Sequence, residues 1–506
     1  MRAPADPPAR RGTAGRRTRS RASTDLALWA SLWASVVCGL GLVLSGLVGL
    51  GDLAPAAALL GLGVGCSAVA GLCVRRVRVP SHPSPMAIFA AACSAWSMMI
   101  LISTAAYLLT GATGSLPDAI FESIAGFCTT NLSVLPQLES LPAAVLFWRA
   151  LTQWLGGFAA LALLAGAFPL YVPALVLPGD IAGLPDRASA PPFGTQLRRI
   201  AVVYGTVSAL CAASYAIAGM GALDAFSYSF TTISTGGFGN HPGGLEYFDS
   251  TAIESVATVF MALAGVSVVT LWWAVRGRWG VLWQSFELRA YLLVLAVGIA
   301  AVAALTWSDG GPAALRRAAV TVTAVSSSTG FEPAGWSGWS WGAQAVLVAL
   351  IATGGMAGTA GGGFQMRRAI AAARYAYREL VTEIHPHTVH VVKIGRRSVA
   401  ERPLALLNGY QILFATAVLA GVFGLSLAGM DLWGGASASI SALATMGPAP
   451  GADLGALEGG ERIVLAVMMV LGRLSFFPLL VLARGAVTGT RRLLSAERAN
   501  GPRMHS

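Results

Sequence analysis

Long apolar runs without a single charged residue are the feature that most constrains how this chain can fold. Residues 86–110, for example, contain no Asp, Glu, Lys or Arg. A helix of that length can cross the roughly 30 Å of hydrocarbon in a bilayer. Only 11% of the 506 residues are charged, which is too few to cover soluble domains of this total size. The sequence therefore predicts an all-α polytopic membrane protein embedded in a lipid bilayer.

One unit recurs four times after a first pair of apolar runs at residues 26–50 and 53–74. Each unit is a long apolar helix, a short insert that ends in Ser, Thr and Gly, and a second long apolar helix. The four inserts end 106, 93 and 117 residues apart, which indicates an internal fourfold repeat. With the first pair, the units make about ten transmembrane helices. The long helices of the units are expected at residues 86–110, 142–170, 200–220, 251–275, 291–307, 341–364, 404–430 and 463–483.

The repeat divides the chain into segments that are joined by short loops. The third repeat carries a Gly-rich stretch inside its second long helix. Each Gly costs about 1 kcal/mol of helix propensity relative to Ala, so this helix should break there. We expect a disordered basic tail at residues 1–24, a helical hairpin at 25–80, repeats at 86–170, 196–276, 288–366 and 404–485, a basic loop at 367–403 and a C-terminal tail at 486–506.

Arg residues cluster in the loops on one side of the predicted helices. Loops on the cytoplasmic side of a membrane carry the excess of basic residues. We therefore expect a multi-pass protein of the inner (plasma) membrane with a cytoplasmic N-terminus and with inserts that open outward. The formal net charge is +11, but the basic residues form no continuous stripe, so no nucleic acid is expected as a partner.

The four inserts are too short to cross a bilayer as helices, so each must enter and leave on the same side. Irregular backbone at that depth occurs only where protein buries it or where it lines water. Four such re-entrant pore loops can surround one axis. Gly permits backbone conformations that point carbonyl groups inward, and Ser and Thr hydroxyls add oxygen ligands. The inserts therefore favour a pathway for a monovalent cation.

Two other functions stand as alternatives. A secondary transporter of another small solute would use inverted repeats and ionisable residues inside the spans, whereas these repeats are parallel and such residues are few. A membrane enzyme would need acids or His at membrane depth, and we expect neither catalysis nor a cofactor. The sequence indicates no metal site at His385, His387 and His390, which have no carboxylate cluster beside them, and no disulfide framework among the six Cys.

Several ordered motifs are FESIAGFCTTNLSVLP (121–136), LFWRALTQWLGGF (146–158), FTTISTGGF (230–238), SSSTGF (326–331), GGMAGTAGGGFQ (354–365) and LGRLSFF (471–477). Together they resemble the membrane subunit of the Trk/Ktr/HKT superfamily of potassium transporters, and the N-terminal hairpin is similar to that of its Trk branch. The resemblance implies potassium uptake through four units of helix, pore loop and helix around one pore. It also implies a homodimer and a cytoplasmic regulatory subunit that binds nucleotides. It leaves open whether Na⁺ or H⁺ is also admitted or coupled.

The resemblance also assigns roles to individual residues. The basic loop at residues 367–402 directly follows the gate helix, and from this position and its charge we predict that the regulatory subunit docks there. The carbonyl groups of four strands would bind K⁺ as a selectivity filter, and these strands are Cys128, Thr129, Thr130 and Asn131; Ser234, Thr235, Gly236 and Gly237; Ser327, Ser328, Thr329 and Gly330; and Ala444, Thr445, Met446 and Gly447. The gate would be an intramembrane loop below the filter together with a pore-facing Arg, formed by Gly354, Gly355, Gly358, Gly361, Gly362, Gly363 and Arg473.

Three residues depart from the family pattern, namely Cys128, Asn131 and Gln365. Asn131 replaces the Gly of the first filter strand. Asn is the non-glycine residue that best tolerates a positive φ, so we expect the strand to keep a filter-like backbone. In plant members of the superfamily a Ser at this position accompanies Na⁺ permeation, so we expect a weaker preference for K⁺ over Na⁺. Arg149 begins a span in a WR pair and is expected to be structural.

Overall fold

The computed structural model describes residues 11–77, 79, 84–135, 137–166, 193–331, 335–385, 387, 391–394, 397–398, 401–452, 454, 457–474, 476 and 479. The predicted C-terminal tail, His390 and most of the loop between the first two repeats lie outside these residues. The described chain is helical apart from its turns and loops and one antiparallel pair of two-residue strands, β1 (Lys393–Ile394) and β2 (Arg397–Ser398).

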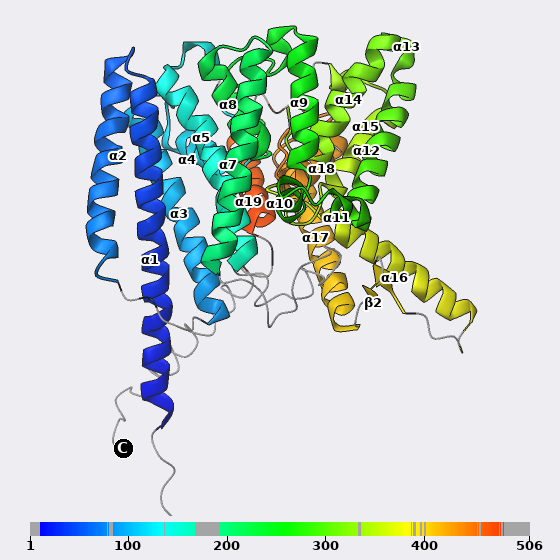
Figure 1. Ribbon diagram of the computed structural model, residues 1–506, viewed down its shortest axis with the longest axis horizontal. Helices are drawn as coiled ribbons and strands as arrows, with labels where there is room; N and C mark the ends of the chain where they lie inside the picture. The colour runs from blue at the N-terminus through cyan, green and yellow to red at the C-terminus, as the bar shows by residue number, and fades with distance from the viewer. Residues whose placement is uncertain are drawn as a thin grey trace, which may run out of the picture.

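Two long helices stand at one edge of the molecule (Figure 1), namely α1 (Arg11–Val48) and α2 (Leu53–Val74). The first of them packs against α2 and against the helices of repeat 1. It begins at Arg11, so the tail that was expected to be disordered over residues 1–24 is helical from that residue on. No Pro follows Pro8 before the apolar run, and the intervening stretch is rich in Arg and Ala, which favour helix.

Each repeat contains a long helix, a pore helix and a second helix, in that order. Repeat 1 comprises α3 (Pro85–Leu109), α4 (Leu116–Phe127), η1 (Leu138–Ser140) and α5 (Ala143–Gly166). Repeat 2 comprises α7 (Phe193–Ile217), α8 (Ala222–Ile233), η3 (Glu246–Phe248), α9 (Thr251–Ala264) and α10 (Val268–Val275). Repeat 3 follows α11 (Trp279–Gln284) and comprises α12 (Phe286–Leu305), α13 (Trp307–Gly310), α14 (Pro312–Ser326), η4 (Trp336–Gly338) and α15 (Trp341–Thr353). After α16 (Met366–Ile384), repeat 4 comprises α17 (Glu401–Leu427), α18 (Leu432–Leu443) and α19 (Gly459–Leu474).

Six of the described helices are long and apolar enough to cross a membrane, and a seventh is counted if the broken pair of α9 and α10 forms one span. Among the other second helices, α15 ends after 13 residues and α19 is described over 16. The chain is a multi-pass membrane protein with the predicted fourfold order of helices. Apolar side chains that face outward fit a lipid environment, and examples are Leu101, Ile217 and Leu427, which are 62%, 87% and 74% exposed.

The continuous helix that was expected over residues 251–275 is wrong. The chain bends by 107° between α9 and α10. Backbone groups at the break pair with the Gly-rich segment of repeat 3 instead of continuing the helix. The Gly265 carbonyl accepts from the Met356 N–H at 3.0 Å, and the Val268 N–H donates to the Gly358 carbonyl at 3.1 Å. Satisfying these groups from another segment allows irregular backbone inside a membrane.

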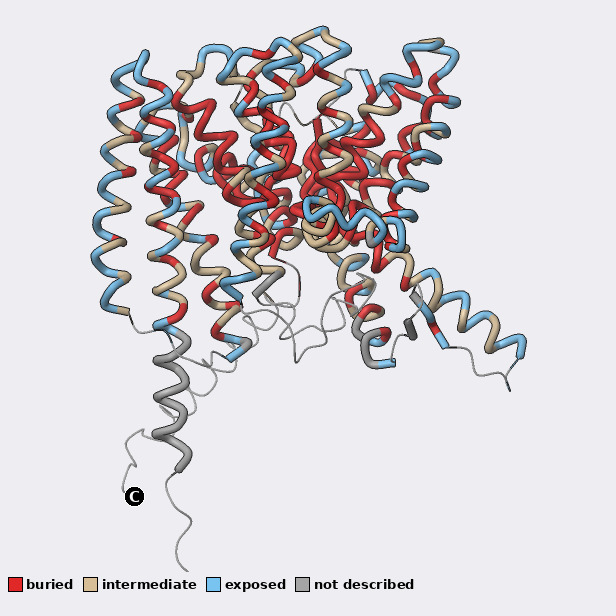
Figure 2. The backbone as a smooth tube through the Cα atoms, viewed as in Figure 1, coloured by how far each residue is buried: buried red, intermediate tan, exposed pale blue. Residues whose placement is uncertain are grey.

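The pore helices α4, α8, α14 and α18 occupy the interior of the described chain. Figure 2 shows the buried backbone gathered in the middle of the molecule, with exposed residues on the outer helices. On one side of this body, the N-terminal part of α1 and the helix α16 both project outward (Figure 1). The same side carries the basic segments from which the cytoplasmic orientation is predicted.

Candidate functional site

The four pore helices all end with the same backbone turn. The first residue of each predicted filter strand caps its helix in the right-handed region, and the second residue has a positive φ. The third residue then donates its N–H to the carbonyl five residues earlier, at 2.8–3.0 Å. This is a Schellman turn, which usually places Gly at the left-handed position. Those left-handed positions are Thr129, Thr235, Ser328 and Thr445, with φ values of 50°, 57°, 61° and 53°.

The side chains at the left-handed positions are costly for the backbone. A residue with a Cβ pays about 1–2 kcal/mol there, and Gly would avoid that cost. All four positions nevertheless carry a hydroxyl, and all four residues are fully buried. The hydroxyl oxygens of Thr129 and Ser328 have no hydrogen-bond partner among the described residues. Backbone strain that is repeated at equivalent positions marks a functional site, and unpaired oxygens at such a site suit a cation.

The ends of the four filter strands converge, and Asn131 lies at their meeting point. Its backbone N–H donates to the Met446 carbonyl at 2.9 Å. Its side-chain Nδ2 donates to the Gly330 carbonyl at 2.7 Å. A Cβ added to Gly237 would lie 3.1 Å from the Asn131 Cβ. One residue of repeat 1 therefore contacts the filter strands of the three other repeats.

The expectation that the first strand keeps the backbone of the others holds only in part. The three equivalent glycines, Gly237, Gly330 and Gly447, have φ values of 77°, 73° and 108°, whereas Asn131 does not have a positive φ. A left-handed Asn would pay a conformational cost, and the observed conformation is held by the two hydrogen bonds to neighbouring strands. The filter is consequently asymmetric at this level.

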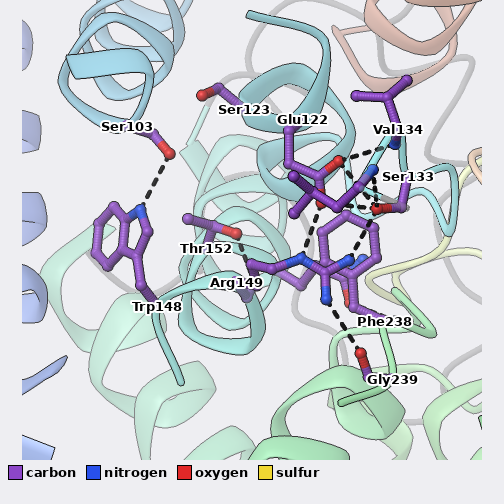
Figure 3. A network of polar contacts seen from close by, with 12 residues as sticks. Ser103, Glu122, Ser123, Ser133, Val134, Trp148, Arg149, Thr152, Phe238 and Gly239 are labelled. Carbon is purple, nitrogen blue, oxygen red and sulfur yellow. Dashed lines mark hydrogen bonds and ion pairs between the residues drawn. The ribbon is translucent and has the colours of Figure 1, made fainter. Parts of the chain in front are cut away.

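Helix α5 braces the first two filter strands from behind. The Arg149 Nε donates to the Glu122 carboxylate on α4 at 2.8 Å, and its Nη1 donates to the Gly239 carbonyl at 3.1 Å (Figure 3). The guanidinium also lies 4.4 Å from the centre of the Phe238 ring. Both charged side chains are almost completely buried. Arg149 therefore connects the pore helix of repeat 1 with the strand of repeat 2, in agreement with the expected structural role.

A second brace lies one helical turn further along α5. The Gln153 Nε2 donates to the Gly236 carbonyl at 3.0 Å, and its Oε1 accepts from the Phe238 N–H at 3.1 Å. Sequence reasoning missed both Gln153 and Glu122. The signals were present, because Glu122 is the only acid inside the first insert after its opening Asp118, and Gln153 stands four residues after Arg149 on the same helix face.

The Gly-rich segment forms an irregular loop, hereafter the intramembrane loop, residues 354–365. It begins where α15 ends at Thr353, as the glycine run predicts, and it leads into α16. Gly354, Gly358 and Gly363 have φ values of 63°, 87° and 86°. Gln365, one of the residues that depart from the family pattern, also has a positive φ, 70°. These left-handed φ values interrupt a right-handed helix, and a side chain at any of the three glycines would be strained.

The intramembrane loop touches the filter and Arg473. The Gly362 N–H donates to the Thr445 Oγ1 at 3.0 Å, so the loop is bonded to a filter residue. The Arg473 Nη1 donates to the Ala360 carbonyl. The Nε and Nη2 atoms of Arg473 have no partner among the described residues, although the side chain is buried. A cavity beside the loop is lined by Ala360, Gly361, Gly362, Tyr410 and Arg473.

A buried carboxylate holds the intramembrane loop from its other side. Glu287, in the first turn of α12, accepts from the Ala357 N–H at 2.7 Å and from the Arg367 Nε at 2.9 Å. Sequence reasoning did not single out Glu287. Its position at the boundary of an apolar span gave no sign of a partner on a segment 70 to 80 residues away.

The basic loop that was expected to dock a regulatory subunit is partly engaged within the chain. Arg367 and Arg368 are buried, so they do not form part of an accessible surface. Arg378 pairs with Glu379 and Glu401. The exposed apolar residues of α16 are Tyr377, Leu380 and Ile384.

Comparisons with known proteins match this arrangement. A family model described as TrkH, cation transport protein, matches residues 195–488. The Trk system potassium uptake protein TrkH of Halomonas elongata is 32% identical over 405 residues, which are 76% of this chain and 83% of that protein. The protein of the same name from Escherichia coli K12 is 27% identical over 408 residues, 76% of this chain and 84% of that protein. The crystal structure of the potassium transporter TrkH from Vibrio parahaemolyticus matches with a TM-score of 0.81 at 25% identity, covering 91% of this chain and 98% of that chain.

The resemblance inferred from the motifs is thereby confirmed, as is the fold of four helix, pore-loop and helix units. The family model spans more than half of the sequence, and the Halomonas relative is matched over most of its length. The chain therefore belongs to the TrkH family of cation transport proteins.

Proposed function

We propose that this protein takes up K⁺ across the plasma membrane through a pore whose selectivity filter is formed by the four strands that follow the pore helices. The observation that carries the proposal is the repeated left-handed hydroxyl residue at the end of each pore helix, for example Thr129 and Ser328. The names of the Halomonas and Escherichia relatives, potassium uptake proteins, agree with it.

Electrostatics favours a cation at this place. Each helix C-terminus carries roughly half a negative elementary charge, and four pore helices end at the filter. The unpaired hydroxyl oxygens of Thr129 and Ser328, together with strand carbonyls, supply oxygen ligands that can replace water around K⁺. The filter thus offsets the free-energy cost of dehydrating K⁺ with partial charges. A full negative charge would bind the ion too tightly for rapid passage.

The intramembrane loop and Arg473 form the gate in this proposal. The loop is bonded to the filter residue Thr445, and Arg473 places a buried positive charge next to the loop at Ala360. A cation that leaves the filter toward the cytoplasm meets both. The loop therefore has to move for conduction, and the Arg charge raises the barrier until it does.

The filter is expected to prefer K⁺ over Na⁺ less strongly than a filter with four glycines. Asn131 engages the carbonyl groups of Gly330 and Met446, so these oxygens are less available to an ion. Fewer carbonyl ligands weaken the field that distinguishes K⁺ from Na⁺. We therefore expect Na⁺ to pass more readily than through a filter with four glycines.

The assembly and orientation are part of the same proposal. The chain forms a homodimer in the inner membrane with its N-terminus in the cytoplasm. A nucleotide-binding regulatory subunit docks on the exposed part of α16, where Tyr377 and Leu380 are 69% and 65% exposed. This helix connects directly to the intramembrane loop at Met366, so a subunit bound there acts on the gate.

The test is rescue of a bacterium that lacks potassium uptake, grown in medium of low K⁺ with the regulatory subunit of the same organism supplied. The wild type should restore growth. The double variant Thr129→Ala/Gly330→Ser, produced at equal level in the membrane, should not. Failure of the wild type to rescue growth would reject potassium uptake, and rescue by both would reject the filter assignment.

A further inference from the structure

We propose that Glu287 is a positioning residue that latches the intramembrane loop to the first turn of α16 and so holds the gate closed. One carboxylate oxygen accepts from the Ala357 N–H at 2.7 Å, in the middle of the loop. The other oxygen accepts from the Arg367 Nε at 2.9 Å and from its Nη2 at 2.5 Å. The inference rests on the proposed role of this loop as the gate.

The latch is buried, so separating its two charged side chains costs much free energy. The Glu287 and Arg367 side chains are 3% and 5% exposed. A charge left without its partner in such a place is strongly unfavourable, so the two side chains have to move together. Two N–H groups of the guanidinium converge on one carboxylate oxygen, which fixes the direction of the contact. Displacement of Arg367 therefore pulls on Glu287 and through it on the backbone of Ala357.

Helix α16 can supply that displacement. Arg367 is the second residue of the helix, and Ala371, one turn later, is still buried against Leu407. Further along, Tyr377 and Leu380 are exposed and the helix projects from the body (Figure 1). A helix whose outer half is exposed and whose inner end holds a buried ion pair acts as a lever. Movement of the outer end reaches the loop through the chain at Met366, and the latch carries it in addition to Ala357 in the middle of the loop.

The latch is distinct from the contacts that the loop makes with the pore. Arg473 holds Ala360 from α19, and Thr445 holds Gly362 from the filter. Neither residue touches the Glu287 carboxylate. Breaking the latch should consequently raise the open fraction of the gate and leave the ion preference of the filter unchanged.

The experiment measures K⁺ flux of the purified chain in proteoliposomes without a regulatory subunit. Glu287→Gln keeps an acceptor for Ala357 but removes the charge, and Arg367→Met keeps most of the side-chain length without the charge. Each should raise basal flux about threefold or more, because the closed state loses stabilisation. The double variant should raise flux no further than the larger single effect, since both changes break one interaction. The K⁺/Na⁺ flux ratio should not change.

Two control variants distinguish failure of the latch from failure of the gate assignment. Glu254→Gln removes a carboxylate that pairs with Arg316 at 3.4 Å, far along the chain from the loop, and should leave flux unchanged. Arg473→Ala tests the gate itself. If Arg473→Ala raises flux and Glu287→Gln does not, the latch is wrong and the gate stands. If neither variant raises flux, the gate assignment fails and the latch with it.

If Glu287→Gln or Arg367→Met folds poorly, milder substitutions still test the latch. Arg367→Lys keeps the charge but loses the paired Nε and Nη2 donors, so it should fold and give a flux between those of the wild type and Arg367→Met. Two results together would overturn the latch: a folded Arg367→Lys protein with wild-type flux, and a Glu287→Asp protein whose flux is also unchanged. A changed K⁺/Na⁺ ratio in any of these variants would also overturn it, because the effect would then act through the filter.

Discussion

The side-chain Nδ2 of Asn131 donates a hydrogen bond to the carbonyl oxygen of Gly330 at 2.7 Å, so repeat 1 is joined to repeat 3 within the filter. No glycine at position 131 could make this bond. The side-chain amide of Asn131 donates to the Gly330 carbonyl oxygen, which in the proposed filter would otherwise face an ion. Because of this asymmetry, we expect the ion selectivity of this protein to differ from that of a protein whose filter has four glycines.

The first prediction concerns ion selectivity. Asn131→Gly removes the hydrogen bond to Gly330 and allows a positive φ at position 131. A net hydrogen bond of about 1 kcal/mol corresponds to roughly a fivefold change, so the K⁺/Na⁺ flux ratio should rise by about that factor. Competition between the two ions in an isotope flux assay measures it. Asn240→Gly is the control, because the Asn240 side-chain amide likewise donates a hydrogen bond, but to Asp224 outside the predicted filter. An unchanged ratio in Asn131→Gly would show that the amide does not influence ion choice.

The second prediction concerns the buried Arg below the filter. Arg473→Ala removes the positive charge beside the intramembrane loop and the contact with Ala360, so basal K⁺ flux should rise at least about threefold. Arg473→Lys should stay close to the wild type because it keeps the charge. Flux in proteoliposomes is the measurement. A folded Arg473→Ala protein with lower flux would instead assign the residue a purely structural role.

The third prediction concerns the brace on α5. Arg149→Met leaves the Glu122 carboxylate buried and unpaired, which should destabilise the protein by about 3–5 kcal/mol. The effect is measured by thermal unfolding in detergent, with the loss of monodisperse protein as the signal of unfolding. Glu122→Gln combined with Arg149→Met should recover part of the stability because no buried charge is left alone. Equal stability of the wild type and Arg149→Met would contradict the assigned role of this ion pair.

The fourth prediction concerns the regulatory subunit. Tyr377→Ser and Leu380→Ser on the exposed part of α16 should together weaken binding of the cytoplasmic nucleotide-binding subunit of the same organism. A pull-down from solubilised membranes measures binding. Leu101→Ser and Ile217→Ser change apolar residues that are equally exposed but face the lipid, and these should leave binding intact. Undiminished binding by the α16 variant would place the docking surface elsewhere.

The fold could be predicted because it depends on local sequence, and the predicted filter strands share a turn that the same local sequence repeats. Each pore helix ends at a Ser, Thr or Gly pattern, and the spacings of 106, 93 and 117 residues reappear in the left-handed residues Thr129, Thr235, Ser328 and Thr445. The break after Thr353 was likewise predictable, since a run of glycines lowers helix propensity within the segment itself.

The remaining features depend on partners that are distant in the sequence. The bend after α9 exists because Gly265 and Val268 pair with the intramembrane loop, and nothing in residues 251–275 identifies that partner. Glu287 and Gln153 are ordinary polar residues until their bonds to the loop and the filter are known. The conformation of Asn131 was mispredicted because its tolerance of positive φ was considered without the neighbouring carbonyl groups that compete for its N–H donors.

The most direct test of the four-strand filter compares two glycines with the same backbone strain. Gly330 has a φ of 73° and Gly335 a φ of 72°. A Cβ at Gly330 would collide with the Met446 carbonyl of the neighbouring filter strand, whereas a Cβ at Gly335 would meet no atom of the described residues within 4 Å. The measurement is K⁺ flux in proteoliposomes for Gly330→Ala and Gly335→Ala at equal amounts of folded protein. The account predicts that Gly335→Ala keeps most of the wild-type flux and that Gly330→Ala loses at least about 90% of it, since about 1.4 kcal/mol suffices for a tenfold change. Equal flux from the two variants would contradict the filter.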